Sequence, residues 1–193
     1  MNHLLSKIGS YPFEKLNLLL KDIKPSKDVI NLSIGEPKLS ADSKVLDILN
    51  KETNSFSNYP PMNAVPELSE AYRQYLKSHF GIKNVAEDEV CLVAGTREGT
   101  FSIIQALFNK ENVKDKPYVV MPNPFYQIYG GATTLAGGEA KFLDCPEEDN
   151  FQPDLGSLKS EDWQKCQILV LCSPNNPTGS VLPLSKLKDI LDL

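Results

Sequence analysis

Two asparagines stand between prolines in the segment SPNNPTG, residues 173–179, which follows a run of five apolar residues. The apolar run, residues 168–172, is long enough for a strand buried on both faces and too short for most helices. A tight X-Pro turn can aim a side-chain amide in a fixed direction, and open α/β sheets bind ligands at the carboxyl ends of their strands. The segment therefore predicts either a ligand-binding amide or an ordinary strand-to-loop turn.

A second candidate site is the segment GTRE, residues 95–98, between an expected strand at 90–94 and an expected helix. Such a helix start directs free backbone N–H groups and the positive end of the helix dipole toward an anion. A cation such as Arg97 is otherwise disfavoured in a first turn, and its place is explained if its backbone or side chain faces a phosphate. The alternative is a helix that starts after a glycine, because no GxGxxG or Walker pattern is present.

A third candidate is the aromatic group Phe125, Tyr126 and Tyr129, which follows the expected strand 118–121. Three aromatic side chains at a strand end can form a stacking platform for a flat ring, and they can equally fill the core. The three strands would thus present an anion-binding helix start, an aromatic cluster and an amide. A ligand with a phosphate, a flat ring and a polar ring substituent would use all three, and pyridoxal phosphate is such a ligand.

The elements that must position these residues can be read from hydrophobic periodicity and turn residues. We expect helices over residues 13–24, 43–49, 68–80, 101–108 and 157–164 and from 184 onward, and strands over 90–94, 118–121, 140–143 and 168–172. Their alternation predicts an α/β fold with a largely parallel sheet and right-handed crossovers. The last helix reaches the end of the chain without a cap or a following strand, so we expect a truncated chain.

The composition of the chain argues against nucleic-acid and membrane partners. The net charge of −5, without a block of basic residues, argues against nucleic-acid binding. No apolar run reaches the length of a membrane span and the N-terminus lacks an apolar signal core, so we expect a cytoplasmic protein with no membrane partner.

The cysteines and histidines give no sign of a metal or nucleophilic site. The four cysteines lack C-x-x-C spacing, and only two histidines accompany them, so we expect no metal site and no Ser-His-Asp or Cys-His catalysis. Cys91 and Cys172 lie in expected strands, where a reduced thiol acts as a small hydrophobic side chain.

Four ordered motifs carry a family resemblance from about residue 10 to the last residue: IGEP at 34–37, Tyr59-Pro60, GTRE at 95–98 and NPTG at 176–179. In these the chain resembles the class I and II aminotransferases, pyridoxal-phosphate enzymes of fold type I. Within that family it looks most like the succinyldiaminopimelate aminotransferases of lysine biosynthesis. The matching segments there are residues 11–16, 33–38, 95–98 and 122–129.

The resemblance implies a role for each motif. Gly95, Thr96 and Arg97 would hold the cofactor phosphate, chiefly through backbone N–H groups. Tyr126 would stack on the pyridine ring, and Asn176 would hydrogen-bond the ring O3′ and touch the substrate carboxylate. Two further positions complete the set: Tyr59 would reach the phosphate of the neighbouring subunit in a homodimer, and Gly35 would lie against the substrate carboxylate.

The sequence also departs from the family pattern. Ala64 stands where a glycine is usual, which puts the positive-φ conformation of that loop in doubt, and Asn175 replaces another common glycine. The Schiff-base lysine, the aspartate on the pyridine nitrogen, the tyrosine on O3′ and the carboxylate-binding arginine are expected beyond residue 193. We therefore assign no catalytic residue, and expect this chain alone to be inactive.

The resemblance implies a partial three-layer fold-type I large domain with a mixed, mostly parallel sheet. Residues 1–40 would form the N-terminal arm and a small-domain segment, and residues 41–193 the first part of the large domain. The parent enzyme would pass an amino group between glutamate and an acidic keto acid, with succinyldiaminopimelate and 2-oxoglutarate as the expected substrates. The alternatives are another fold-type I enzyme, such as a C–S lyase or a decarboxylase, and a non-catalytic ligand-binding module.

Overall fold

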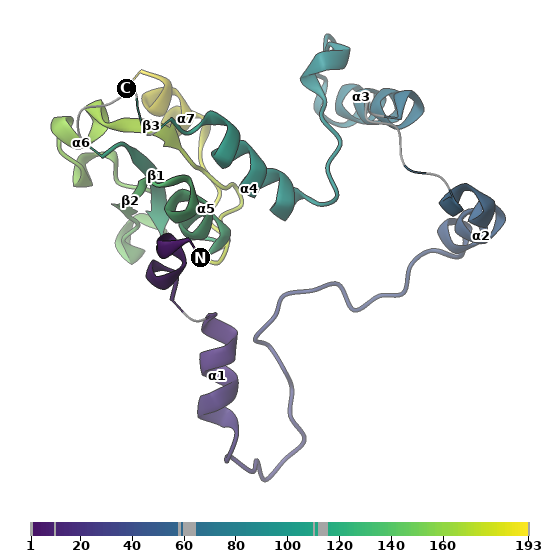
Figure 1. Ribbon diagram of the computed structural model, residues 1–193, viewed down its shortest axis with the longest axis horizontal. Helices are drawn as coiled ribbons and strands as arrows, with labels where there is room; N and C mark the ends of the chain where they lie inside the picture. Colours follow the sequence, from purple (N-terminus) through teal and green to yellow (C-terminus); the bar gives the residue numbers. More distant parts are fainter. Residues whose placement is uncertain are drawn as a thin grey trace. The chain divides into compact units, whose positions relative to one another are not determined.

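The computed structural model describes residues 2–9, 11–57, 59, 65–109, 111 and 116–192. The chain forms two compact units, one made of residues 1–9 and 93–193 and the other of residues 10–92. The first unit contains the sheet of strands β1, β2 and β3 (Figure 1). None of the helices in the described part of the chain is long and apolar enough to cross a membrane.

The sheet of the first unit has the strand order β2-β1-β3, and both pairings are parallel. Its strands are β1 (Tyr118–Asn123), β2 (Glu139–Asp144) and β3 (Cys166–Leu169). The strands expected at 118–121 and 140–143 are confirmed. The strand expected at 168–172 is observed as β3, which begins two residues earlier and ends at Leu169. Pairing with β1 continues one residue further, because the Val170 N–H donates a hydrogen bond of 2.8 Å to the Val120 carbonyl.

Helices surround this sheet in the first unit. They are α4 (Thr96–Leu107), α5 (Ile128–Ala136), α6 (Ser160–Gln164) and α7 (Leu184–Leu191), with 3₁₀ turns η1 (His3–Lys7), η4 (Glu147–Asp149) and η5 (Leu155–Ser157). Helices α4 and α5 pack together, and Gln105 Nε2 donates to the Ala132 carbonyl at 2.7 Å. The expected helices at 101–108, 157–164 and from 184 are confirmed, although α4 begins five residues earlier.

The core of the first unit lies between β1 and α5. Val119 and Met121 are fully buried, and they cluster with Phe108 and Tyr129. Since side chains alternate across a strand, Val120 points to the other face, where it is also fully buried. A strand buried on both faces is what the continuous apolar run at residues 118–121 predicts.

Helix α5 was not expected from the sequence. It contains Gly130, Gly131, Thr133 and Thr134, residue types with low helix propensity. Packing on the core compensates, because Tyr129, Ala132 and Thr133 are buried, and Gly137 ends the helix with a left-handed φ of 85°.

The second unit consists of α1 (Pro12–Leu20), α2 (Ser43–Lys51) and α3 (Pro66–Phe80), with 3₁₀ turns η2 (Thr53–Ser57) and η3 (Glu87–Glu89). Asp42 caps α2 by accepting a hydrogen bond from the Lys44 N–H at 2.8 Å. Gly81 ends α3 with a left-handed φ of 70°. The three expected helices are confirmed in place, with α1 ending four residues before the expected end.

The prediction of a strand at residues 90–94 is wrong. The structure shows no strand there, and Cys91, which was expected to be a buried hydrophobic side chain, is exposed. A strand requires a hydrogen-bonded neighbour, and the three described strands pair only with one another. The segment also straddles the boundary between the two units, which falls after residue 92. The apolar run therefore lies outside the sheet formed by the described residues.

Candidate functional site

The helix start at Gly95 has the geometry of an anion site. Gly95 precedes α4 with a φ of 144°, a conformation that side chains rarely adopt, and an added Cβ would lie 2.7 Å from Glu98 Oε2. No side chain caps this helix, so its first N–H groups have no capping acceptor there. Thr96 and Arg97 are both exposed, and none of the described carboxylates forms an ion pair with Arg97. The residue types and backbone therefore fit a phosphate.

The aromatic cluster divides between core and surface. Tyr129 is 7% exposed and belongs to the core, whereas Tyr126 is half-buried and packs against the edge of that core. Their rings meet edge to face, with centroids 5.7 Å apart and an interplanar angle of 89°. Tyr129 thus fills the core, whereas Tyr126 keeps part of its side chain accessible, and its stacking role stays a prediction. Phe125 also packs against the core, and its ring pairs with that of Phe142 in β2.

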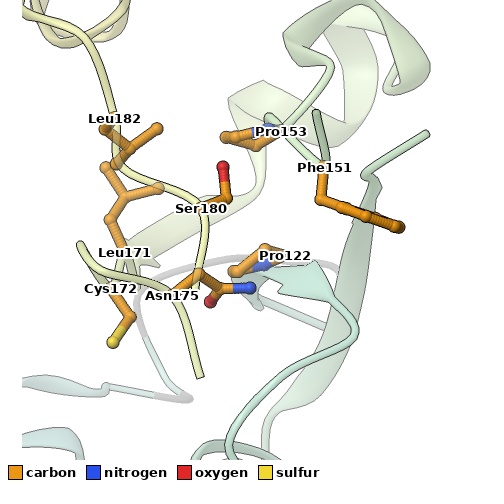
Figure 2. Close-up of a pocket in the computed structure, with 8 residues that line it drawn as sticks. All are labelled: Pro122, Phe151, Pro153, Leu171, Cys172, Asn175, Ser180 and Leu182. Atoms are coloured by element: carbon orange, nitrogen blue, oxygen red, sulfur yellow. The ribbon is translucent and has the colours of Figure 1, made fainter. Parts of the chain in front are cut away.

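The two asparagines in the turn after β3 differ in exposure. Asn175 is 8% exposed and Asn176 is exposed. Asn175 holds the turn together through its backbone, which is bonded to Ser180 and Gly179, and through Nδ2, which donates to Thr178 Oγ1 at 3.0 Å. Figure 2 shows its amide beside Pro122, in a pocket that Ser180 also lines.

Asn176 keeps its amide available. In the part of the chain that the structure describes, no group hydrogen-bonds the Asn176 side chain. Asn175 has no positive φ, so the substitution of asparagine for a common glycine imposes no left-handed conformation here. No role was expected for Asn175, although the pair of adjacent asparagines is a signal that one of the two side chains can fold inward. The peptide bonds preceding Pro124, Pro174 and Pro177 are all cis.

Tyr126 and Asn176 follow the carboxyl ends of two adjacent parallel strands, β1 and β3. Both residues therefore lie in the segments that follow the carboxyl ends of these strands, which is where open α/β sheets bind ligands. Gly95 begins the helix that packs on α5, and α5 in turn carries Tyr129. The first unit therefore contains Gly95, Thr96, Arg97, Tyr126 and Asn176.

Gly35 and Tyr59 lie in the other unit. Gly35 is exposed with no heavy atom within 4 Å of an added Cβ, and Tyr59 is 98% exposed. Their expected roles therefore stay predictions. Ala64, the departure noted in that loop, lies outside the described residues.

The cysteines of the first unit, Cys145, Cys166 and Cys172, are partly buried, and for Cys172 this agrees with the expected small hydrophobic side chain. Burial raises the pKa of the Cys145 and Cys166 thiols, which keeps both protonated at neutral pH. Cys172 follows β3, and its thiol donates to the Pro174 carbonyl at 3.1 Å.

Burial is the main reason that the pKa of Tyr129 rises to about 12, and the neighbouring Cys172 adds to the effect. Because the folded state holds this proton more tightly than the unfolded state, Tyr129 stabilises the fold fully below pH 10, and that contribution is lost as the pH rises through 12. We expect the urea midpoint of the chain to fall over this range, and to fall less in Tyr129→Phe. Trp163, the only tryptophan, allows fluorescence to follow unfolding of this unit. Equal losses in both proteins would contradict the assignment.

Comparison with known proteins agrees with these features. Residues 27–193 match the family model for aminotransferase class I and II. The chain is 28% identical over 182 residues to an LL-diaminopimelate aminotransferase of Natranaerobius thermophilus, covering 93% of this chain and 46% of that protein. It is also 28% identical over 180 residues to an aspartate aminotransferase of Pyrococcus horikoshii, covering 93% and 44%.

Solved structures give the same result. An aminotransferase of Neisseria meningitidis is 39% identical with a TM-score of 0.90, over 100% of this chain and 49% of that chain. The aminotransferase AspB of Helicobacter pylori is 34% identical with a TM-score of 0.86, over 96% and 48%. The chain thus spans about half the length of the relatives it matches. It belongs to the class I and II aminotransferases, a family of fold-type I enzymes that depend on pyridoxal phosphate.

Proposed function

We propose that this chain supplies the part of an aminotransferase that holds the phosphate, one face of the ring and the ring O3′ of pyridoxal phosphate. The observation that carries the proposal is that Tyr126 and Asn176 follow the carboxyl ends of two adjacent parallel strands. The uncapped helix start after Gly95 suits the phosphate, because it offers free N–H groups and the positive end of the dipole.

Bound pyridoxal phosphate supplies an electron sink for amino transfer. The residues of this chain would bind and orient it. The N–H groups of Thr96 and Arg97 would hold the phosphate, the Tyr126 ring would cover one face of the pyridine, and the Asn176 amide would donate to O3′. Each role needs an accessible group, and Thr96, Arg97 and Asn176 are exposed while Tyr126 is half-buried.

The remaining roles belong to the whole protein and to its second unit. We propose that Tyr59 reaches the phosphate of the neighbouring subunit in a homodimer and that Gly35 lies against the substrate carboxylate. The exposure of both residues is compatible with contacts to other parts of an assembled enzyme. The division after residue 40 and the cytoplasmic location stay predictions.

We propose that the whole enzyme transfers an amino group between glutamate and an acidic keto acid, with N-succinyldiaminopimelate and 2-oxoglutarate as the preferred pair. The names of the relatives support the acidic class, since diaminopimelate and aspartate both carry a second carboxylate. The succinylated substrate rests on the segments at 11–16, 33–38 and 122–129. Because the relatives reported above are aminotransferases, they favour amino transfer over the C–S lyase, decarboxylase and ligand-binding alternatives.

An amino-donor screen on the natural protein that contains this chain tests the proposal. Three donors would be offered with 2-oxoglutarate as acceptor: aspartate, LL-diaminopimelate and N-succinyl-LL-diaminopimelate. Glutamate would be offered as donor with oxaloacetate, the keto acid of aspartate, as acceptor. We expect the succinylated donor to give the highest kcat/KM. Binding of pyridoxal phosphate would be measured first, so that a lack of bound cofactor can be distinguished from a lack of aminotransferase activity. Cofactor binding without consumption of 2-oxoglutarate by any donor would refute the aminotransferase proposal.

A further inference from the structure

The asparagine turn, residues 173–182, is closed by hydrogen bonds between its own residues. At its base the Leu182 N–H donates to Ser173 Oγ at 3.0 Å. Further along the turn the Asn175 N–H donates to the Ser180 carbonyl at 2.8 Å. These bonds hold the two sides of the turn together. The turn is therefore braced internally, and the place of its exposed amide depends on where the whole turn is held.

Gln152 joins the asparagine turn to a different part of the sheet. It follows β2 and the 3₁₀ turn η4, whereas the asparagine turn follows β3. The Gln152 Nε2 donates to Ser180 Oγ at 2.5 Å and to the Val181 carbonyl at 3.0 Å. Among the described residues, these are the hydrogen bonds that connect the segment after β2 with the asparagine turn. The Gln152 amide therefore anchors the turn from outside.

The two segments that Gln152 connects come from opposite sides of β1, because the strand order is β2-β1-β3. Its hydrogen bonds therefore pass the carboxyl end of β1, where the chain continues toward Tyr126. A small pocket at this place is lined by Pro122 of β1, by Pro153 and by Ser180, as Figure 2 shows. The asparagine turn is thus held over the strand end that leads to the expected ring-stacking residue.

The backbone before Gln152 has an uncommon conformation. Asn150 and Phe151 have positive φ values of 50° and 57°, which a bulky side chain rarely adopts. The Phe151 N–H donates to the Pro146 carbonyl at 2.9 Å, and the Gln152 N–H donates to the Asp149 carbonyl at 3.0 Å. Such a conformation persists only where the surrounding structure imposes it, and it is found most often near functional sites. The backbone of Gln152 is therefore fixed on the β2 side, which also limits where its amide can reach.

We propose that Gln152 is a positioning residue that sets where the Asn176 amide lies. Its two hydrogen bonds hold the asparagine turn over the end of β1, and the bonds within the turn carry this position to Asn176. This inference rests on the proposed function, since it assumes that the Asn176 amide donates to O3′ of pyridoxal phosphate. Gln152 need not touch the cofactor. Its loss affects recognition of O3′ and not of the phosphate.

The test compares two ligands on the natural protein that contains this chain, prepared without cofactor. Pyridoxine 5′-phosphate has an alcohol in place of the aldehyde, so it cannot bond covalently to a lysine, and its 3-deoxy analogue lacks O3′. The ratio of the two Kd values measures how strongly O3′ is recognised. A loss that affects both ligands equally cancels in this ratio. Asn176→Ala gives the ratio expected when the amide is absent.

The variants separate positioning from general stability. Gln152→Met keeps the length of the side chain and removes the donor. Gln167→Met is the matched control, because Gln167 Nε2 also donates to a backbone carbonyl, that of Asn109 at 2.7 Å, but at the amino end of β3. Ser180→Ala removes one of the two acceptors of Gln152, and Ser180→Thr keeps it. The urea midpoint of each variant is measured alongside.

The wild type is expected to bind pyridoxine 5′-phosphate about tenfold more tightly than the 3-deoxy analogue, as a hydrogen bond to O3′ predicts. In Gln152→Met this ratio should fall about threefold or more, toward the Asn176→Ala value, while the Kd of the 3-deoxy analogue stays within about twofold. Ser180→Ala should lower the ratio less, and Ser180→Thr and Gln167→Met should keep it. The double variant Gln152→Met/Asn176→Ala should match Asn176→Ala, because both changes remove the same contact.

A wild-type ratio in Gln152→Met would overturn the inference, and so would an equal weakening of both ligands or an equal fall of the ratio in Gln167→Met. If Gln152→Met does not fold, Ser180→Ala decides in the same way against Ser180→Thr. A wild-type ratio in Asn176→Ala refutes the proposed contact between Asn176 and O3′, and this inference with it. A wild-type protein that binds neither ligand refutes the proposed function as a whole.

Discussion

Replacement of Gly95 with alanine is expected to weaken the binding of pyridoxal phosphate to this chain by about tenfold or more, because strained backbone costs of order 1–3 kcal/mol. The φ of 144° at Gly95 is one that alanine rarely adopts, and the new Cβ would lie 2.7 Å from Glu98 Oε2. To relieve the strain, the start of α4 must move. The N–H groups of Thr96 and Arg97 then no longer converge on one anion.

Two further variants separate backbone strain from other effects. Gly95→Ala/Glu98→Ala removes the side-chain collision and leaves the φ requirement, so it should not restore binding. Gly131→Ala is the matched control, because it lies inside α5 with no heavy atom within 4 Å of an added Cβ, and it should bind as the wild type does. Equilibrium dialysis gives the affinities. A Gly95→Ala affinity within twofold of the wild type would show that α4 does not hold the phosphate.

The 193-residue chain is expected to show no amino transfer even when saturated with pyridoxal phosphate. On the family resemblance, the lysine that bonds covalently to the cofactor is not among these residues. The lysines that lie against the sheet are also in the wrong place. The ammonium groups of Lys141 and Lys165 lie 4.7 and 5.8 Å from the centre of the Tyr118 ring, at the start of β1. Tyr126 and Asn176 instead follow the carboxyl ends of β1 and β3, whereas Tyr118 lies at the amino end of β1.

Borohydride reduction in the presence of the cofactor, followed by peptide mass spectrometry, tests this expectation. Scattered, substoichiometric modification of surface lysines is the expected result, together with no turnover of glutamate. Cofactor binding measured in the same sample shows that the site is filled. A stoichiometric adduct on a single lysine, accompanied by consumption of glutamate, would prove the expectation wrong.

Elements set by local sequence were predicted well, and elements set by distant partners were predicted less consistently. The helix ended by Gly81 and the helix that follows Asp42 depend on nearby residues, and both are confirmed. The strand at 118–121 is also confirmed, and it does have distant pairing partners in β2 and β3. The strand expected at 90–94 failed because hydrophobicity alone does not supply a pairing neighbour. Helix α5 was missed for the converse reason, since packing against β1 overrides the low propensity of its glycines and threonines.

The candidate site shows the same division. Motif and turn chemistry identified residues 95–97, Tyr126 and Asn176, and the structure puts all of them in one unit. The sequence could not separate the inward Asn175 from the outward Asn176, because adjacent asparagines have the same chemistry and differ only in burial.

The position of β1 between its two neighbours has a consequence for how the chain folds. Tyr118 pairs with Glu139, and the chain between them contains a single helix. Tyr118 also pairs with Cys166, which is much further along the chain, and closing this longer loop costs more entropy. The unit β1–α5–β2 is therefore expected to assemble first, with Tyr126 and Tyr129 already in contact. The asparagine turn arrives only when β3 docks. A substitution that delays docking would leave one edge of β1 open to pairing with other molecules, so aggregation during synthesis would compete with completion of the ring-binding site.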